Sequence, residues 1–357
     1  MKILAPARNG DALAALFDAG ADSCYIGLNR HNARTQNNLE GLNVTVDELA
    51  AVAAACRARG KELFIALNGF PTDSGLDAFS SELADATRLP ISGLIVANLG
   101  MLDLVRTLSA DVPIKLSIQN GACNADEILV IDRLFTLSGV TLPRFLRLEE
   151  VAEMRRLLPA RIEIEVLGHG LICPNVEGQC FLGSFLLNSS ANQGGVGGPE
   201  SLAGDRATLS VIFDLLLDNP PEVLEQGIVN LHPCQGVFCG TDRSGERRRI
   251  RLHEHLKVAS LDLVHQLMAA GVGRLKIEGR QHPVPRVVSM VEVYRHAIDQ
   301  AVAFGMAYRP DAADRHGLAK FELYRDNLTD NHFYHNPLAC RALPEAEPAT
   351  GNGEAGD

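Results

Sequence analysis

The chain has 357 residues, of which 46% are hydrophobic and 22% charged, and this is the composition of an ordinary globular protein. Its 33 basic and 44 acidic residues leave a formal net charge of −11, which opposes binding of nucleic acid through the phosphate backbone. No apolar run approaches the roughly 18 residues that a transmembrane helix needs. The segment Met1–Pro6 lacks the layout of a signal peptide, so a cytoplasmic protein without a membrane span is expected.

The first 168 residues alternate between apolar strand-like runs and segments with helical period. The predicted strands are Lys2–Ala5, Ser23–Gly27, Leu63–Leu67, Gly93–Ala97, Ile114–Ile118, Val140–Leu142 and Ile162–Leu167. The helices predicted between them include Asp11–Asp18, Val46–Ala58, Met101–Leu108, Asp126–Leu134 and Leu148–Leu157. An eighth strand, Arg274–Glu278, comes after a long interruption and precedes a helical stretch at Val284–Val302. This order predicts an α/β fold, a closed (β/α)8 TIM-like barrel, with an open doubly wound sheet as the alternative.

The interruption suggests how the chain is divided. Residues 1–169 would carry barrel strands 1–7, and residues 170–255 would form a cysteine-bearing insertion after strand 7, over the barrel mouth. Residues 256–306 would supply strand 8 and the closing helices, residues 307–341 a C-terminal extension, and residues 342–357 a disordered tail.

Polar side chains follow the ends of the predicted strands. The candidate substrate-binding residues are Asn32, Arg34, Asn68, Asn98 and Gln119, and the candidate catalytic residues are Arg144, His169, Glu278 and Arg280. Any one of them is ordinary where a strand meets a loop, but their repetition predicts a polar pocket for a small molecule. Arg144 and Arg280 suit a carboxylate. His169 and Glu165 are candidates for proton transfer, although Glu165 could instead face the helix layer.

Two close pairs of cysteines lie in the predicted insertion, Cys173 with Cys180 and Cys234 with Cys239. Neither pair has the CxxC spacing that is typical of a structural zinc site. Four thiolates from a loop-rich segment suit an iron–sulfur cluster, which accepts varied spacings, while buried structural cysteines are the plainer interpretation. Amide side chains are poor acid–base catalysts, so a cofactor would have to supply the difficult chemistry.

Several segments resemble the so-called U32 peptidase family. They are the start Leu4–Gly10, the strand residues Tyr25–Leu28 after Gly20–Asp22, the KIEGR run Lys276–Arg280, and the central series Glu165–Gly170, Cys173, Glu177, Gly178, Cys180, Ser184 and Asn192. The resemblance covers roughly residues 2–302. Despite the family's label, it implies a hydroxylase that uses a 4Fe-4S cluster without molecular oxygen, in some members with the dicarboxylate prephenate as the oxygen donor.

Within the family, Asn32–Arg34 and Gly41–Thr45 resemble the members that act in oxygen-independent ubiquinone biosynthesis. That branch implies a small aromatic or prenylated substrate and a second U32-family subunit as partner in a heterodimer. A hydrolase, a non-catalytic partner subunit and an RNA base hydroxylase are the alternatives.

The resemblance also implies the cluster ligands. Cys173 and Cys180 match the first two of the family's cysteines and Cys234 matches the last, whereas the third position is Gly-rich here, near Gly197. Cys239 could replace the missing ligand, the cluster could keep one open iron, or the cluster could be lost. This departure suggests a diverged paralogue.

Overall fold

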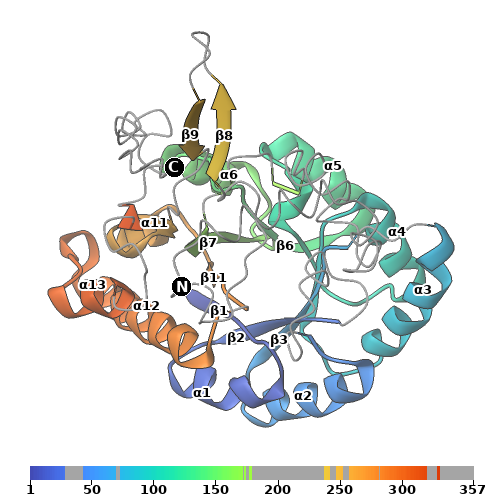
Figure 1. Cartoon of the computed structure of the whole chain (residues 1–357). Helices are drawn as coiled ribbons and strands as arrows, with labels where there is room; N and C mark the ends of the chain where they lie inside the picture. The colour runs from blue at the N-terminus through green and yellow to red at the C-terminus, as the bar shows by residue number, and fades with distance from the viewer. Residues whose placement is uncertain are drawn as a thin grey trace, which may run out of the picture.

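The computed structural model describes residues 1–28, 43–69, 73–171, 173, 177–178, 237–241, 247–251, 257–280, 282–319 and 328–329. Parallel strands stand at the centre and helices surround them (Figure 1). The barrel strands are β1 (Lys2–Pro6), β2 (Ser23–Gly27), β3 (Glu62–Leu67), β4 (Gly93–Val96), β5 (Ile114–Leu116), β6 (Leu137–Thr141), β7 (Glu163–Leu171) and β11 (Arg274–Ile277). Because β11 pairs in parallel with both β1 and β7, the sheet closes on itself. The predicted (β/α)8 barrel is confirmed, and the open sheet is excluded.

Helices lie on the outside of the barrel, most of them between successive strands. They are α1 (Leu13–Asp18), α2 (Val46–Ala58), α3 (Asp73–Thr87), α4 (Leu99–Leu108), α5 (Ala125–Phe135), α6 (Leu148–Leu157), α11 (Val264–Ala269), α12 (Val284–Phe304) and α13 (Ala312–Ala319). Side-chain caps determine where several of them start. Thr45 and Glu48 form a capping box at α2, and Asn98 and Asn124 cap α4 and α5. These caps explain why α4 and α5 begin earlier than the hydrophobic periodicity predicts.

Short strands follow the seventh barrel strand. β10 (Lys257–Ala259) pairs antiparallel with the end of β7 and parallel with β12 (Leu328–Thr329). β8 (Val237–Thr241) and β9 (Arg247–Arg251) form a separate antiparallel pair, so part of the arginine-rich run is a strand. Most of the predicted insertion and all of the predicted tail, residues 342–357, lie outside the described residues.

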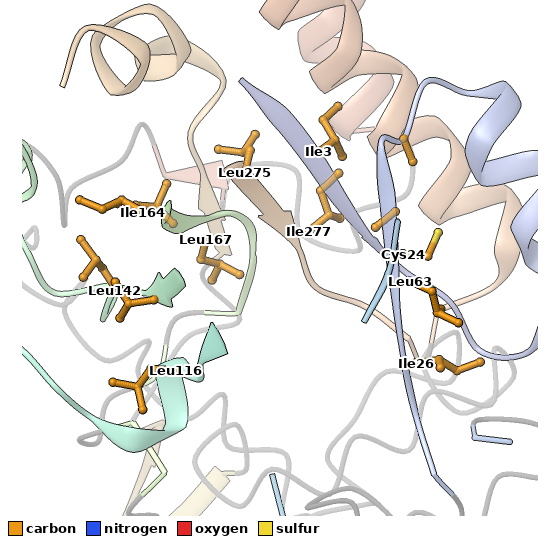
Figure 2. Close-up of a cluster of buried hydrophobic side chains, with 14 of the residues drawn as sticks. Ile3, Cys24, Ile26, Leu63, Leu116, Leu142, Ile164, Leu167, Leu275 and Ile277 are labelled. Atoms are coloured by element: carbon orange, nitrogen blue, oxygen red, sulfur yellow. The ribbon is translucent and has the colours of Figure 1, made fainter. Parts of the chain in front are cut away.

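The strands divide the core into two layers, because successive side chains of a strand point to opposite faces. The large hydrophobic cluster, to which the helices also contribute buried side chains, contains Ile164, Leu275 and Ile277 (Figure 2). Val166 belongs to the same cluster. A second, smaller cluster consists of Leu4, Tyr25, Phe64, Ala66 and Ile95. Its members alternate with outward-facing residues on β1–β4, so they fill the barrel interior on that side.

Candidate functional site

Charged side chains fill the other half of the barrel interior. Lys115 on β5 donates hydrogen bonds to Glu163 at 2.6 Å and to Glu165 at 3.2 Å, both on β7. From β11, Arg274 donates to Glu163 at 2.9 Å. Lys276, also on β11, has its ammonium 3.9 Å from a carboxylate oxygen of Glu165. The interior therefore holds a chain of alternating positive and negative groups that begins at the base of the barrel and continues toward its mouth.

Two aromatic rings join the apolar half of the interior to the charged half. The ammonium of Lys115 lies 4.6 Å from the ring centroid of Phe64, and the Arg274 guanidinium lies 5.2 Å from the same centroid. The ammonium of Lys276 is 4.7 Å from the ring of Tyr25. Cations over aromatic faces are stabilised by the ring quadrupole, so each ring supports a cation in a region with little access to water.

Glu165 is fully buried within this network. Burial by itself would raise the pKa of Glu165, but the charges of Lys115 and Lys276 outweigh it and the pKa lies below its usual value. Thr141 also donates a hydrogen bond to the carboxylate at 2.8 Å. The structure thus places Glu165 inside the barrel and not against the helix layer, as an ionised group whose partners are fixed.

Arg144 lies at the mouth, three residues after β6 ends, and its guanidinium is held between two carboxylates. Its Nε and Nη2 donate to Glu177, and its Nη1 and Nη2 each donate to Glu278 at 3.2 Å. Burial would lower the pKa of Arg144, but Glu177 and Glu278 outweigh that effect and raise it. Arg144 was predicted to bind a substrate carboxylate, whereas the structure pairs it with two carboxylates of the protein.

Arg280 is the second predicted guanidinium of the mouth, just beyond β11. It is buried, and its Nη1 donates to Asn43 Oδ1 at 2.8 Å. Its guanidinium carbon lies 5.9 Å from the ring centroid of Tyr25. Glu278 and Arg280 both follow β11 directly, so the structure brings the two arginines and Glu278 to one end of the barrel.

His169 lies elsewhere than expected. The pairing of β11 with β7 shifts register between Lys276 and Ile277, so that His169 stands opposite the outward-facing Ile277. The His169 ring lies edge-on to Tyr294 of α12, with the ring centroids 5.9 Å apart, and Nδ1 is 3.4 Å from the Tyr294 hydroxyl. That hydroxyl donates to the carbonyl of Gly168 at 2.8 Å. The imidazole is therefore packed toward the outer helix layer, away from Arg144 and Glu278.

The amide residues have different positions. Asn98 Oδ1 accepts hydrogen bonds from the amides of Gly100 and Met101, so this side chain caps α4. Asn68 Oδ1 and Gln119 Oε1 are buried oxygens that receive no hydrogen bond within the described part of the chain. An acceptor in that state is costly unless water or a ligand satisfies it, which keeps Asn68 and Gln119 as candidates for binding. Asn32 and Arg34 lie outside the described residues.

One of the four candidate metal ligands is described with its side chain. Cys173 lies just beyond β7, is partly exposed, and is close enough to the Arg144 guanidinium to interact with it electrostatically. Cys239 stands opposite Arg249 in the β8–β9 pair. Cys180 and Cys234 lie outside the described residues. The partly exposed thiol at the barrel mouth keeps Cys173 as a candidate metal ligand.

Sequence reasoning missed several residues of this region as functional candidates. Glu177 and Asn43 were noted only as parts of family-like segments, yet they contact the two arginines of the mouth. The pattern predicts Lys115 only as a strand residue, and Lys276 as a strand residue at the start of the KIEGR run. A signal for the interior charges was present, because Ile162–Val166 and Arg274–Glu278 alternate charged with apolar residues, and this pattern places every second side chain on one face.

Comparison with known proteins adds independent findings. The family model described as peptidase family U32 matches residues 8–197 and 229–341. The tRNA hydroxylation protein P of Escherichia coli (strain K12) is 29% identical over 330 residues, which cover 85% of this chain and 68% of that protein. A protein named collagenase from Porphyromonas gingivalis is 24% identical over 307 residues, which cover 84% of this chain and 65% of that protein.

A solved U32 peptidase structure superposes with a TM-score of 0.44 at 13% identity, covering 79% of this chain and 95% of that one. None of the helices in the described ranges combines the length and the hydropathy needed to cross a bilayer.

Proposed function

Because this chain belongs to peptidase family U32, and curated relatives of it carry names that refer to hydroxylation, we propose that it is an oxygen-independent hydroxylase. Its cofactor in this proposal is a 4Fe-4S cluster held by Cys173, Cys180, Cys234 and Cys239 over the barrel mouth. The substrate would be a small aromatic or prenylated molecule, and the oxygen donor a dicarboxylate of the prephenate type.

The observation that carries this proposal is the surroundings of Cys173. Cys173 follows the carboxyl end of β7, the end of the barrel at which enzymes of this fold have their active sites, and it interacts electrostatically with the buried Arg144 guanidinium. Arg144 is oriented by four hydrogen bonds to Glu177 and Glu278, so these charged groups are in place before any ligand binds. Charged and hydrogen-bonding groups around the ligands are among the means by which proteins tune such clusters.

The chain's own side chains would bind and orient the reactants. Arg280, the second guanidinium of the mouth, would bind a carboxylate of the donor. Glu278 is 18% exposed, against 4% for Glu177, and is therefore the carboxylate placed to accept a hydrogen bond from the substrate. Asn68 and Gln119 would direct their buried oxygens to donor groups of the ligand.

The reaction balances without molecular oxygen. The donor gives up one oxygen atom and is reduced by two electrons, while a C–H bond of the acceptor becomes C–OH and is oxidised by two electrons. When bound, the cluster would supply a path for these electrons.

The cofactor part of the proposal is tested by anaerobic purification and measurement of iron, sulfide and visible absorption. We expect about four irons per chain and a broad band near roughly 400 nm. Cys239→Ala should lose both, and Cys123→Ala, which alters an exposed cysteine outside the proposed set, should keep them. A wild-type chain that stays folded and free of iron would overturn the cluster assignment. Iron that persists in Cys239→Ala would remove Cys239 from the ligand set and leave a three-cysteine site.

RNA base hydroxylation is the second candidate, and the name of the Escherichia coli relative favours it. The net charge of −11 opposes it, because RNA binding depends on cationic surfaces. Cells that lack this protein would distinguish the two. A missing hydroxylated nucleoside in RNA digests would support the RNA candidate, and accumulation of an unhydroxylated small aromatic precursor would support the first.

Two further outcomes would replace the hydroxylase. Turnover only after a second U32-family chain is added, with no effect of Arg280→Met in this chain, would make it a partner subunit. Cleavage of peptides by the metal-free protein would favour the hydrolase that the family name describes. A cytoplasmic location remains a prediction.

A further inference from the structure

An ion pair with Arg144 binds Glu177, which follows Cys173 in the sequence, to the barrel. Glu177 accepts hydrogen bonds from Nε and Nη2 of Arg144, and the two side chains are only 4% and 8% exposed. Ion pairs that are shielded from water hold their geometry far better than exposed ones, and removing one partner leaves an unpaired buried charge. Glu177 is four residues after Cys173 and three before Cys180 in the sequence.

The next residue makes a second attachment through the backbone. Gly178 has φ +78, a conformation that favours glycine, and a Cβ placed on it would lie 2.0 Å from the carbonyl oxygen of Gln119. The obstacle is backbone and cannot rotate away. Gly178 therefore packs directly on the short helical turn Ile118–Asn120 that follows β5.

Further hydrogen bonds hold Arg144, the barrel side of the ion pair with Glu177, in place. Glu278 holds the opposite side of the Arg144 guanidinium, and the Glu278 amide donates to the His169 carbonyl at 2.8 Å. Glu278, just beyond β11, thus orients the Arg144 guanidinium independently of Glu177. Pairing with Glu177 therefore costs little additional side-chain entropy of Arg144.

We propose that Glu177 and Gly178 form a latch that binds Arg144 and the Gln119 carbonyl and so holds the chain just beyond Cys173 against the ends of β5 and β6. Arg144 and Glu177 are in this view positioning residues, and neither contacts the substrate. The latch does not require a metal. Its consequence, a pre-set position for Cys173, rests on the proposed function.

The test measures the metal-free full-length chain, kept reduced and anaerobic. Gly178→Ala puts a methyl group against the Gln119 carbonyl without changing any charge. Gly60→Ala is its matched control, because Gly60 also has a positive φ, +64, but nothing lies within 4 Å of an added Cβ. The readouts are hydrogen exchange of peptides that contain residues 171–178 and the alkylation rate of Cys173, with the exposed Cys123 as internal reference.

For Gly178→Ala we expect both rates to rise roughly tenfold or more, the change that about 1.4 kcal/mol of lost local stability produces. Gly60→Ala should leave both at the wild-type value. Equal rates in Gly178→Ala and wild type would overturn the latch. If Gly178→Ala fails to fold, Glu177→Gln provides the same exchange measurement with a side chain of equal size, and unchanged exchange there would likewise reject the proposal.

Iron content separates this result from the proposed function. If the latch holds Cys173 in place for a cluster, Gly178→Ala should contain less iron than Gly60→Ala. If the wild type binds no iron, the cluster proposal fails, while the exchange and alkylation rates still decide whether the latch exists.

Discussion

Lys115 and Glu163 form a 2.6 Å ion pair inside the barrel across the strand that lies between them. In the register of the sheet, Lys115 stands opposite Gly139 of β6, and Gly139 stands opposite Glu163 of β7. The middle position of this row has no side chain, so the lysine and the glutamate meet over it. A Cβ added to Gly139 would lie 3.1 Å from the Glu163 carbonyl oxygen and 3.3 Å from Lys115 Cγ.

A larger side chain at Gly139 should therefore separate this ion pair. We expect Gly139→Val to destabilise the protein by about 2–4 kcal/mol, from overpacking together with a weakened buried ion pair. Chemical denaturation followed by circular dichroism gives the value. Gly75→Ala, on α3 with nothing within 4 Å of an added Cβ, serves as the control and should be neutral or slightly stabilising. A Gly139→Val protein as stable as wild type would show that the interior pair contributes nothing measurable.

Neutralising Glu165 should be costly because it leaves Lys115 and Lys276 with an uncompensated positive charge in the interior. We expect Glu165→Gln to lower the free energy of unfolding by about 3–5 kcal/mol. Glu153→Gln, which breaks an exposed pair with Arg156 on α6, should change it by less than about 1 kcal/mol.

The difference in stability between wild type and Glu165→Gln should depend on pH, because the pKa of Glu165 is lowered in the folded protein. A carboxylate with a depressed pKa in the folded state stabilises the protein above its unfolded pKa of about 4.3, and this contribution is lost as the pH falls through the folded pKa. The stability gap between wild type and Glu165→Gln should therefore narrow in acid. A stability difference that stays constant from neutral pH to pH values well below ~4 would contradict the lowered pKa of Glu165.

Two buried tyrosines should respond in opposite ways to loss of the hydroxyl group. The Tyr294 hydroxyl donates to the Gly168 carbonyl at 2.8 Å, so Tyr294→Phe should cost about 1–2 kcal/mol. The Tyr308 hydroxyl is buried and makes no hydrogen bond with the described residues, so Tyr308→Phe should be neutral or stabilising. Thermal melts of the two variants measure this. Equal destabilisation of both would argue against the role assigned to Tyr294 in tying α12 to β7.

The contact between α12 and α13 should weaken above neutral pH. His296 Nδ1 lies 2.9 Å from Asp314, and this hydrogen bond to the carboxylate raises the pKa of His296. A raised pKa means that the stabilisation is fully present below about pH 6.5 and is lost as the pH rises through the folded pKa. Because the His296 side chain is 46% exposed, solvent screening limits the effect to about 0.2–1 kcal/mol. The local stability of α13, measured by hydrogen exchange, should be lower at about pH 8.5 than at about pH 5.5 in wild type, by no more than ~1 kcal/mol. Asp314→Asn should show no such difference.

The barrel can be predicted from the amino-acid sequence alone. Apolar strands separated by helical segments have few ways to bury their apolar faces, and the eighth strand at Arg274 completes a closed sheet. Alternation within Ile162–Val166 also carried the information that glutamates share one face of a strand. Asn68, Arg144 and Glu278 follow the ends of β3, β6 and β11, because strand ends are visible in local hydrophobicity, whereas His169 lies within β7.

Which of those residues contact one another depends on the tertiary structure. Arg144, Glu177 and Glu278 come from three segments far apart in the sequence, and their pairing depends on the closure of β11 against β7. The direction of His169 depends on a register shift between neighbouring strands, which local periodicity cannot reveal because one extra residue reverses the face. Long-range pairing and strand register are properties of the closed barrel, so they appear only when the whole sheet is in place.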